Sequence, residues 1–384
     1  MLLPWMVVVI AFFVSFALSS FLFSKLIVFD IFRVKNFSAA ASTVLGSIVS
    51  AIIFMVFYWT ENDFVKDISV WTFLAPLIGL TLIFVACLID RLYVIDVAVW
   101  IASVIGVFGG DLFIEFIPEG SVVVNKICSV IAWSVFSVAI RCIAMLYPVL
   151  QIQGITIGCG LVALYVFGSA PFMLGLIGAT FLAAMMVAYL NYYNQTLGVT
   201  VSPIIGYIIG WFGLIMYNEM LMPCFLVLVM FCLIEVFICL IKKLTFMKKY
   251  QNFLYNSVLI QVYKSGFPAD AIIKSLWFLS GIVLMFCIFQ ANGVNSYSIP
   301  VFIAVVILWH FYRLLNWKNE EKSWKDINKE VVEDTKEAIA KIVKSSSKVK
   351  KETVKNKKVK TTPSKKTKTT AKKTKSSKTE KRSK

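Results

Sequence analysis

Apolar runs of about 18 to 20 residues recur along the first 315 residues, and short polar stretches separate them. Each run has roughly the length that a helix needs to cross the hydrocarbon core of a bilayer. The pattern predicts an all-α, polytopic integral membrane protein with about eleven transmembrane helices. We expect these spans near residues 3–24, 39–59, 70–89, 92–109, 128–149, 155–169, 172–190, 202–217, 224–241, 272–291 and 298–315.

Charge is divided unevenly between two parts of the chain. Residues 1–316 carry 14 Lys or Arg and 12 Asp or Glu, whereas residues 317–384 carry 24 and 9. The formal net charge of +17 therefore comes mainly from the C-terminal part. Together with 59% hydrophobic residues and a mean hydropathy of +0.82, this distribution predicts a transmembrane domain over residues 1–316 and a basic soluble tail.

The tail divides again by its pattern. Residues 317–345 place apolar side chains at roughly helical spacing, with acids early and lysines late, and this predicts an amphipathic cytoplasmic helix. Residues 346–384 are Lys, Thr and Ser repeats without aromatic residues, and they predict a disordered segment. We favour a solvated tail, with binding to anionic lipid or to nucleic-acid phosphates as the alternatives.

The lysines and arginines of the loops orient the chain. One side of the predicted membrane holds most of them, and the other side is acidic. The first side has Lys25, Arg33, Lys35, Arg91, Lys242, Lys243, Lys248, Lys249 and Lys264; the second has Glu61, Asp63, Asp67, Asp111, Glu115, Glu119 and Glu219 with only Lys66 and Lys126. The positive-inside rule then predicts an external N-terminus and a cytoplasmic tail. The N-terminal run MLLPWMVVVIAFF lacks a basic region and an A-x-A-like cleavage site, which favours a retained first span over a cleaved signal peptide.

Eight cysteines lie inside or beside the apolar runs, without a CxxC pair or a neighbouring histidine. We interpret them as small apolar packing residues rather than as metal or redox groups. The single histidine, His310, falls in the last predicted span. The chain therefore offers few of the side chains that most acid–base or metal chemistry uses.

Two segments on the cytoplasmic side carry acids beside bases. The segment IVFDIFRVKNF follows the first span and holds Asp30, Arg33 and Lys35. The segment ACLIDRLYVID closes the third span and holds Asp90 next to Arg91.

Three further segments follow in order along the same side. After the fifth span, LYPVLQIQGITIGCG holds Gln153 and Thr156, and after the seventh span NYYNQTLGVTVSP holds Val199. The ninth span ends in LIEVFICLIKKL, with Glu235 inside the span and a pair of lysines at its end. The residues after it, YQNFLYNSVLIQVYKSGFPADAII, contain no histidine.

In their order and their placement against the spans, these five segments resemble the polyprenyl-phosphate N-acetylhexosamine phosphotransferases (glycosyltransferase family 4) over about residues 1–290. That family includes the phospho-MurNAc-pentapeptide translocase and the undecaprenyl-phosphate N-acetylglucosaminyl phosphotransferase. Its members move a phospho-sugar from a UDP-sugar to a lipid phosphate, with magnesium held by loop aspartates. The resemblance implies polyprenyl (undecaprenyl) phosphate and a UDP-sugar as partners, beside the lipid bilayer, and a homodimer is a further expectation.

The resemblance also assigns roles to single residues. It makes Asp90 and Glu235 the catalytic candidates, with Asp90 as the candidate metal ligand. It makes six residues candidates for substrate binding, namely Asp30, Arg33, Lys35, Gln153, Lys242 and Lys243.

This chain departs from the family where the family has further aspartates, because Arg91, Gln153, Thr156 and Val199 stand there instead. These replacements remove oxygen ligands that a hard cation needs. The resemblance then implies a degenerate member, a pseudoenzyme of cell-envelope biogenesis that lies as a multi-pass protein in a bacterial inner membrane. The alternatives are an active phosphotransferase with a rearranged site, which requires Mg²⁺, and an unrelated multispan transporter.

Several charged residues also have a structural interpretation. Asp90 and Arg91 end a span, where a local ion pair explains them equally well. Glu235 lies about two turns inside the membrane end, where acids are costly unless they have a partner or a function. Asp96 and Arg141 fall inside predicted spans, so an ion pair between helices is the alternative for them.

Overall fold

The computed structural model describes residues 4–29, 37–60, 69–89, 91–118, 120–144, 146, 148–191, 201–246, 257–292 and 297–316. All of them belong to one unit, Met1–Trp317. The amphipathic helix and the disordered tail predicted for residues 317–345 and 346–384 lie outside the described residues, and so they stay predictions.

The described residues form helices and connections, with no strand among them. The order of elements is α1 (Pro4–Phe29), α2 (Phe37–Trp59), α3 (Val70–Ile89), α4 (Leu92–Val104), the π-helix η1 (Ile105–Gly109), α5 (Val122–Ala139), α6 (Arg141–Ala144), α7 (Val149–Val166), α8 (Phe172–Asn191), α9 (Ser202–Asn218), α10 (Met222–Phe246), α11 (Val258–Lys264), α12 (Ala269–Ala291) and α13 (Ser298–Leu315). The predicted all-α class is confirmed for this part of the chain.

Within the described ranges, nine helices are long and apolar enough to cross a membrane, judged by length and composition. Two shorter apolar helices, Thr43–Trp59 and Ser202–Asn218, complete the series. The bounds of α3 and α13 match the predicted spans, and those of α8 and α9 match to within one residue. The multi-pass architecture therefore agrees with the hydropathy pattern, while the total of eleven spans stays a prediction.

The outward-facing surface of these helices is apolar. Phe13 on α1, Phe278 on α12 and Phe302 on α13 have exposed fractions of 63%, 74% and 51%. Large apolar surfaces of this kind are unfavourable in water and are unremarkable in contact with lipid chains. The exposed faces thus fit the membrane class that the sequence predicts.

Small residues line the contact between α7 and α8. α7 packs against α8, and a Cβ added at Gly158 of α7 would lie 2.8 Å from the Cβ of Leu182 in α8. A Cβ added at Gly178 of α8 would lie 2.6 Å from the Cβ of Leu161. Glycines allow two backbones to approach closely, which is how helices gain packing energy in a membrane.

A buried aromatic pair joins α5 and α9 beside the π-helix. The rings of Trp133 and Tyr207 stack with their centroids 4.4 Å apart. Trp133 Nε1 donates to the carbonyl oxygen of Tyr207 at 2.8 Å, and the Tyr207 hydroxyl donates to the carbonyl oxygen of Ala102 at 3.1 Å. Gly106, inside the π-helix, leaves the space that the Trp133 ring fills. A helix irregularity is thus stabilised by a hydrogen bond from a neighbouring helix.

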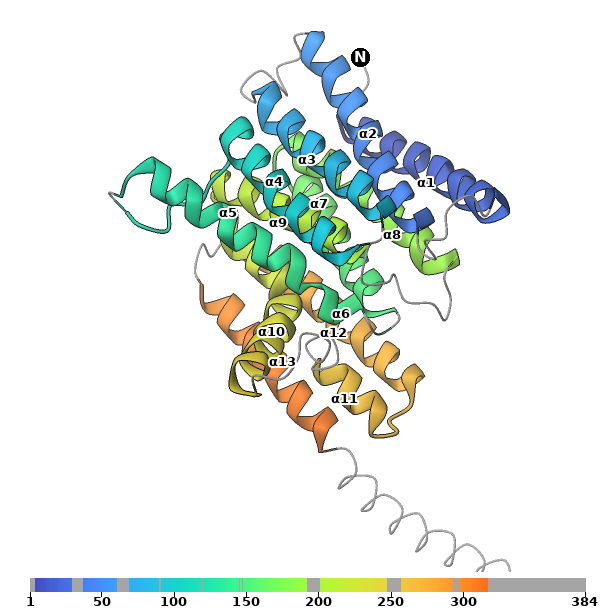
Figure 1. Cartoon of the computed structure of the whole chain (residues 1–384), viewed down its shortest axis with the longest axis vertical. Helices are drawn as coiled ribbons and strands as arrows, with labels where there is room; N and C mark the ends of the chain where they lie inside the picture. The colour runs from blue at the N-terminus through green and yellow to red at the C-terminus, as the bar shows by residue number, and fades with distance from the viewer. Residues whose placement is uncertain are drawn as a thin grey trace, which may run out of the picture. The chain divides into compact units, whose positions relative to one another are not determined.

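The last four helices are consecutive in the sequence and contact one another, and α12 also packs against α7. α10 contacts both α12 and α13, and α11 contacts α13. Figure 1 shows them in yellow to orange at the lower end of the first unit. This group holds most of the described residues that the sequence singled out for function.

Candidate functional site

The structure corrects the prediction for residues 150–154, the loop expected between the spans 128–149 and 155–169. The fifth span consists of α5, which ends at Ala139, and the short helix α6, which together form the apolar stretch Val122–Ala144; α7 then begins at Val149. Gln153 was expected in that loop, and this placement is wrong because Gln153 is buried within α7, as is Thr156 of the expected sixth span. The Thr156 hydroxyl donates to the carbonyl oxygen of Ile152 at 2.8 Å. Apolar neighbours and glycines let α7 extend through this polar stretch.

Five of the predicted site residues cannot be placed by their side chains. Asp30, Arg33, Lys35 and Asp90 lie outside the described residues. Lys243 lies in the last turns of α10, and its side chain is likewise not described. Their predicted roles in substrate and metal binding stay predictions.

Glu235 has a specific structural partner. Its side chain, 1% exposed, lies on α10 and faces the N-terminus of α11. Oε2 accepts the backbone N–H of Val258 at 3.1 Å, and Oε1 accepts the backbone N–H of Leu259 at 3.3 Å and the hydroxyl of Ser257 at 3.2 Å. The carboxylate therefore caps α11, satisfying N–H groups that have no partner within the helix and placing negative charge where the helix dipole favours it.

A second contact joins the same two helices nearer the end of α10. Lys242 Nζ donates to Oε1 of Gln261 at 3.1 Å. Gln261 lies in α11. Two of the predicted site residues, Glu235 and Lys242, thus both lie on α10 and contact the short helix α11. It places Gln153 separately, buried on α7.

Asp96 and Arg141 form the ion pair that the sequence offered as their structural interpretation. Arg141 Nη1 lies 2.6 Å from Asp96 Oδ1, and the two side chains are 2% and 28% exposed. Asp96 comes from the second turn of α4, and Arg141 opens α6. The pair therefore holds the break between α5 and α7 against α4.

Glu235, Lys242 and the Asp96–Arg141 pair lie toward the same end of the bundle as the described loop cations. Arg91 precedes α4, Lys242 and Lys264 lie near the ends of α10 and α11, and Arg313 lies in the last turn of α13. Within the described residues, no group of three or more His, Cys, Asp or Glu side chains is placed to hold a metal ion.

The opposite end of the bundle is acidic. Asp111, in the connection between α4 and α5, lies 2.6 Å from Lys126 Nζ. The backbone N–H of Glu115 donates to the Tyr217 hydroxyl at 3.1 Å and ties this connection to the end of α9. Glu219 follows Tyr217 closely, and partial burial raises its pKa above the ordinary value of a glutamate.

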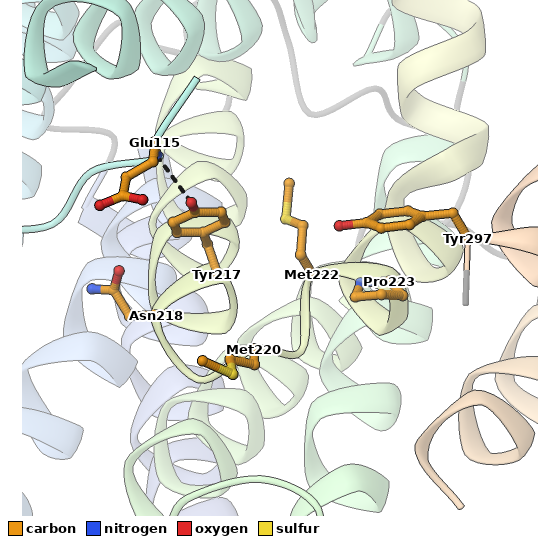
Figure 2. Close-up of a pocket in the computed structure, with 7 residues that line it drawn as sticks. All are labelled: Glu115, Tyr217, Asn218, Met220, Met222, Pro223 and Tyr297. Atoms are coloured by element: carbon orange, nitrogen blue, oxygen red, sulfur yellow. Dashed lines mark hydrogen bonds between the residues drawn. The ribbon is translucent and has the colours of Figure 1, made fainter. Parts of the chain in front are cut away.

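A pocket of about 450 Å³ opens at this acidic end. Figure 2 shows Glu115, Tyr217 and Asn218 on one side of it and Tyr297 on the other, with Met222 between the two tyrosine rings. A carboxylate and two phenol rings suit a cationic or amphipathic group and repel an anionic sugar phosphate. None of the residues that line the pocket is among the predicted phosphotransferase site residues.

Sequence reasoning missed two features of this arrangement. The acceptor role of Glu235 depends on α11, a helix of seven residues that is too short to stand out in a periodicity pattern. The pocket depends on loops that meet only in three dimensions. The pairing of Glu115 with Tyr217 joins residues 102 positions apart, for which the sequence carries no signal.

Comparison of the sequence with models of known protein families and with curated proteins finds no match. The fold itself defines the class: an all-helical, multi-pass membrane protein. Anything finer is argued from the residues.

Proposed function

We propose that this protein is a multi-pass membrane protein of the polyprenyl-phosphate phosphotransferase type that has lost catalysis and binds a lipid phosphate at its cationic end. The observation that carries the proposal is the hydrogen bonding of the Glu235 side chain. Its two oxygens accept three hydrogen bonds from Ser257, Val258 and Leu259, so the carboxylate serves as a helix cap. These bonds occupy most of the acceptor positions of the carboxylate, which leaves it less available to bind magnesium or to accept a substrate proton.

The layout of the cationic end supports the membership part of the proposal. Glu235, Lys242 and Gln261 belong to segments that match the family in order, and they meet at the junction of α10 and α11. Basic side chains at the membrane surface attract a phosphate headgroup, and Lys242, Arg33, Lys35 and Lys243 are the candidates for that contact. The proposal places the protein in a bacterial cytoplasmic membrane, with this end facing the cytoplasm.

The proposal predicts the outcome of a transfer assay. Purified full-length protein with magnesium, UDP-N-acetylhexosamine and undecaprenyl phosphate is expected to release no UMP above background. The charge that develops in phosphoryl transfer is unstabilised where Arg91, Gln153, Thr156 and Val199 replace carboxylates. UMP release is measured by a coupled assay, with an active member of the family as the positive control. Magnesium-dependent release that Asp90→Asn abolishes would establish an active transferase instead.

The binding part is tested separately. Vesicles that contain undecaprenyl phosphate are expected to retain the detergent-solubilised protein better than vesicles of neutral lipid. Replacing Lys242 by glutamine lowers this retention, because one cation at the headgroup is lost. Lys126→Gln, at the acidic end, is the matched control and leaves retention unchanged. Equal retention on both vesicles would contradict lipid-phosphate binding whatever the result of the transfer assay.

The proposed orientation makes a further prediction. A reporter fused after residue 384 is expected to behave as cytoplasmic, and one inserted in the 61–69 segment as external. The reason is that most lysines and arginines of the predicted loops fall on one side of the predicted membrane. Paired alkaline-phosphatase and fluorescent-protein fusions report the two sides, and the opposite pattern in both positions would reverse the orientation.

A further inference from the structure

α10 contributes one cysteine to each of two thiol pairs, one near its start and one nearer its end. Near its start, the Cys287 thiol of α12 donates to the carbonyl oxygen of Cys224 at 3.9 Å, and the two thiols also interact with each other. Near its other end, Cys239 shares a hydrogen bond with Cys142 of α6. All four cysteines are buried. Fifteen residues of helix separate Cys224 from Cys239, which is about 22 Å along the axis.

The two pairs lie at chemically different ends of the molecule. Cys224 follows Met222 and Pro223, which line the acidic pocket together with Glu115. Cys239 follows the buried Glu235 by one turn, beside the junction with α11. With the orientation proposed above, the first pair is next to the external side and the second is next to the cytoplasm. Disulfides form and persist on the external side, whereas cysteines in the cytoplasm are kept reduced as thiols.

We propose that Cys224 and Cys287 form a disulfide that fastens α10 to α12 at the acidic end, and that Cys142 and Cys239 remain thiols. This inference rests on the proposed orientation and not on the proposed lipid-phosphate binding. The oxidant is a disulfide-bearing thiol oxidase on the external side. The disulfide forms while α10 and α12 come together, before their neighbours bury the pair.

The chemistry is a thiol–disulfide exchange that balances. The thiolate of one cysteine attacks a sulfur of the oxidase disulfide, breaking that bond and forming a mixed disulfide. The thiolate of the second cysteine then displaces the oxidase, leaving the bond between Cys224 and Cys287. The oxidase gains two electrons and the two protons that the cysteines lose, and it leaves as a dithiol.

Such a bond complements the contacts at the other end of the same helices. It closes a segment of the chain that contains Glu235, Lys242 and all of α11, because its two cysteines are 63 positions apart. The Glu235 cap holds α10 to the start of α11 at the cationic end. The disulfide holds α10 to α12 at the acidic end. The unit α10–α12 is then fastened at both ends.

The two thiol pairs provide an internal comparison. Two full-length variants are produced in the cytoplasmic membrane of a bacterium with an oxidising periplasm. One retains only Cys224 and Cys287, the other retains only Cys142 and Cys239, and serine replaces the remaining six cysteines in each. After an acid quench, the denatured proteins react with a polyethylene-glycol maleimide and are separated on a non-reducing gel. The first variant is expected to add maleimide twice only after reduction, and the second to add it twice with or without reduction.

Maleimide addition to unreduced Cys224 and Cys287, or protection of Cys142 and Cys239, would overturn the proposal. The unsubstituted protein supplies a second measurement that does not depend on the folding of the variants. Its thiols are blocked with N-ethylmaleimide, it is digested, and mass spectrometry identifies a peptide that links Cys224 to Cys287. Recovery of both cysteines as blocked peptides overturns the proposal. The reporter fusions separate a wrong orientation from a wrong pairing.

Discussion

Replacing Asp96 by leucine is expected to lower the free energy of unfolding by about 3–5 kcal/mol, because it removes one partner from a buried ion pair. Arg141 is 2% exposed and lies 2.6 Å from the Asp96 carboxylate. A guanidinium cannot give up its proton, so its charge stays buried when the carboxylate is gone. Unfolding by sodium dodecyl sulfate in mixed micelles, followed by circular dichroism, measures the change.

The reverse replacement and the double variant separate charge from packing. Arg141→Leu is expected to cost less, because Asp96 is 28% exposed and water can reach the carboxylate that is left behind. The double variant with leucine at both positions is expected to recover most of the loss, since apolar pairs often replace buried ion pairs without penalty. A double variant as unstable as Asp96→Leu would show that the two positions do not act as a pair.

The ion pair at the acidic end is the matched control. Asp111 and Lys126 are also 2.6 Å apart, but the Asp111 side chain is 76% exposed. Water screens such a pair, and removing it is expected to change the free energy of unfolding by less than about 1 kcal/mol. A loss at Asp111→Asn equal to that at Asp96→Leu would mean that burial does not decide the effect.

The apolar pattern predicted most helices because a membrane imposes one simple requirement on sequence. A helix that crosses the bilayer must be apolar along its length, so α3 and α13 could be read with their bounds. The prediction failed at the start of α7, where Gln151 and Gln153 are polar and buried. Hydropathy assigns such residues to loops, whereas their environment is decided by the neighbouring helices, which no local pattern reports.

The site was less predictable than the fold, for a physical reason. The sequence marked Glu235 as an acid inside a span, which called for a partner or a function. Its partners are two backbone N–H groups and a hydroxyl 22 to 24 residues further along the chain. Nearly every residue has a backbone N–H group, so the sequence does not mark which of them will need an acceptor. That depends on where a helix begins. By contrast, an ion pair between helices was the structural alternative for Asp96 and Arg141, because both charges fall inside predicted spans.

Replacing Glu235 by leucine is expected to lower the free energy of unfolding by roughly 2–6 kcal/mol, because two buried N–H groups lose their acceptor at about 1–3 kcal/mol each. Val258 and Leu259 donate these bonds at the start of α11, and Ser257 donates a third from its side chain. The same denaturation in mixed micelles measures the loss. Proteolysis between α10 and α12 is expected to accelerate, since α11 loses its cap.

A graded series distinguishes a cap from a catalytic carboxylate. Ser257→Ala removes one hydroxyl donor and is expected to cost about 1–2 kcal/mol, less than Glu235→Leu. Glu235→Gln falls between them, because its amide oxygen can still accept two bonds while its NH₂ group faces the N–H of Val258. Asp270→Asn, an exposed acid at the start of α12, is the control and leaves stability unchanged. A catalytic carboxylate that does not support the fold would give a Glu235→Gln protein of full stability, and that result would remove the main argument for lost catalysis.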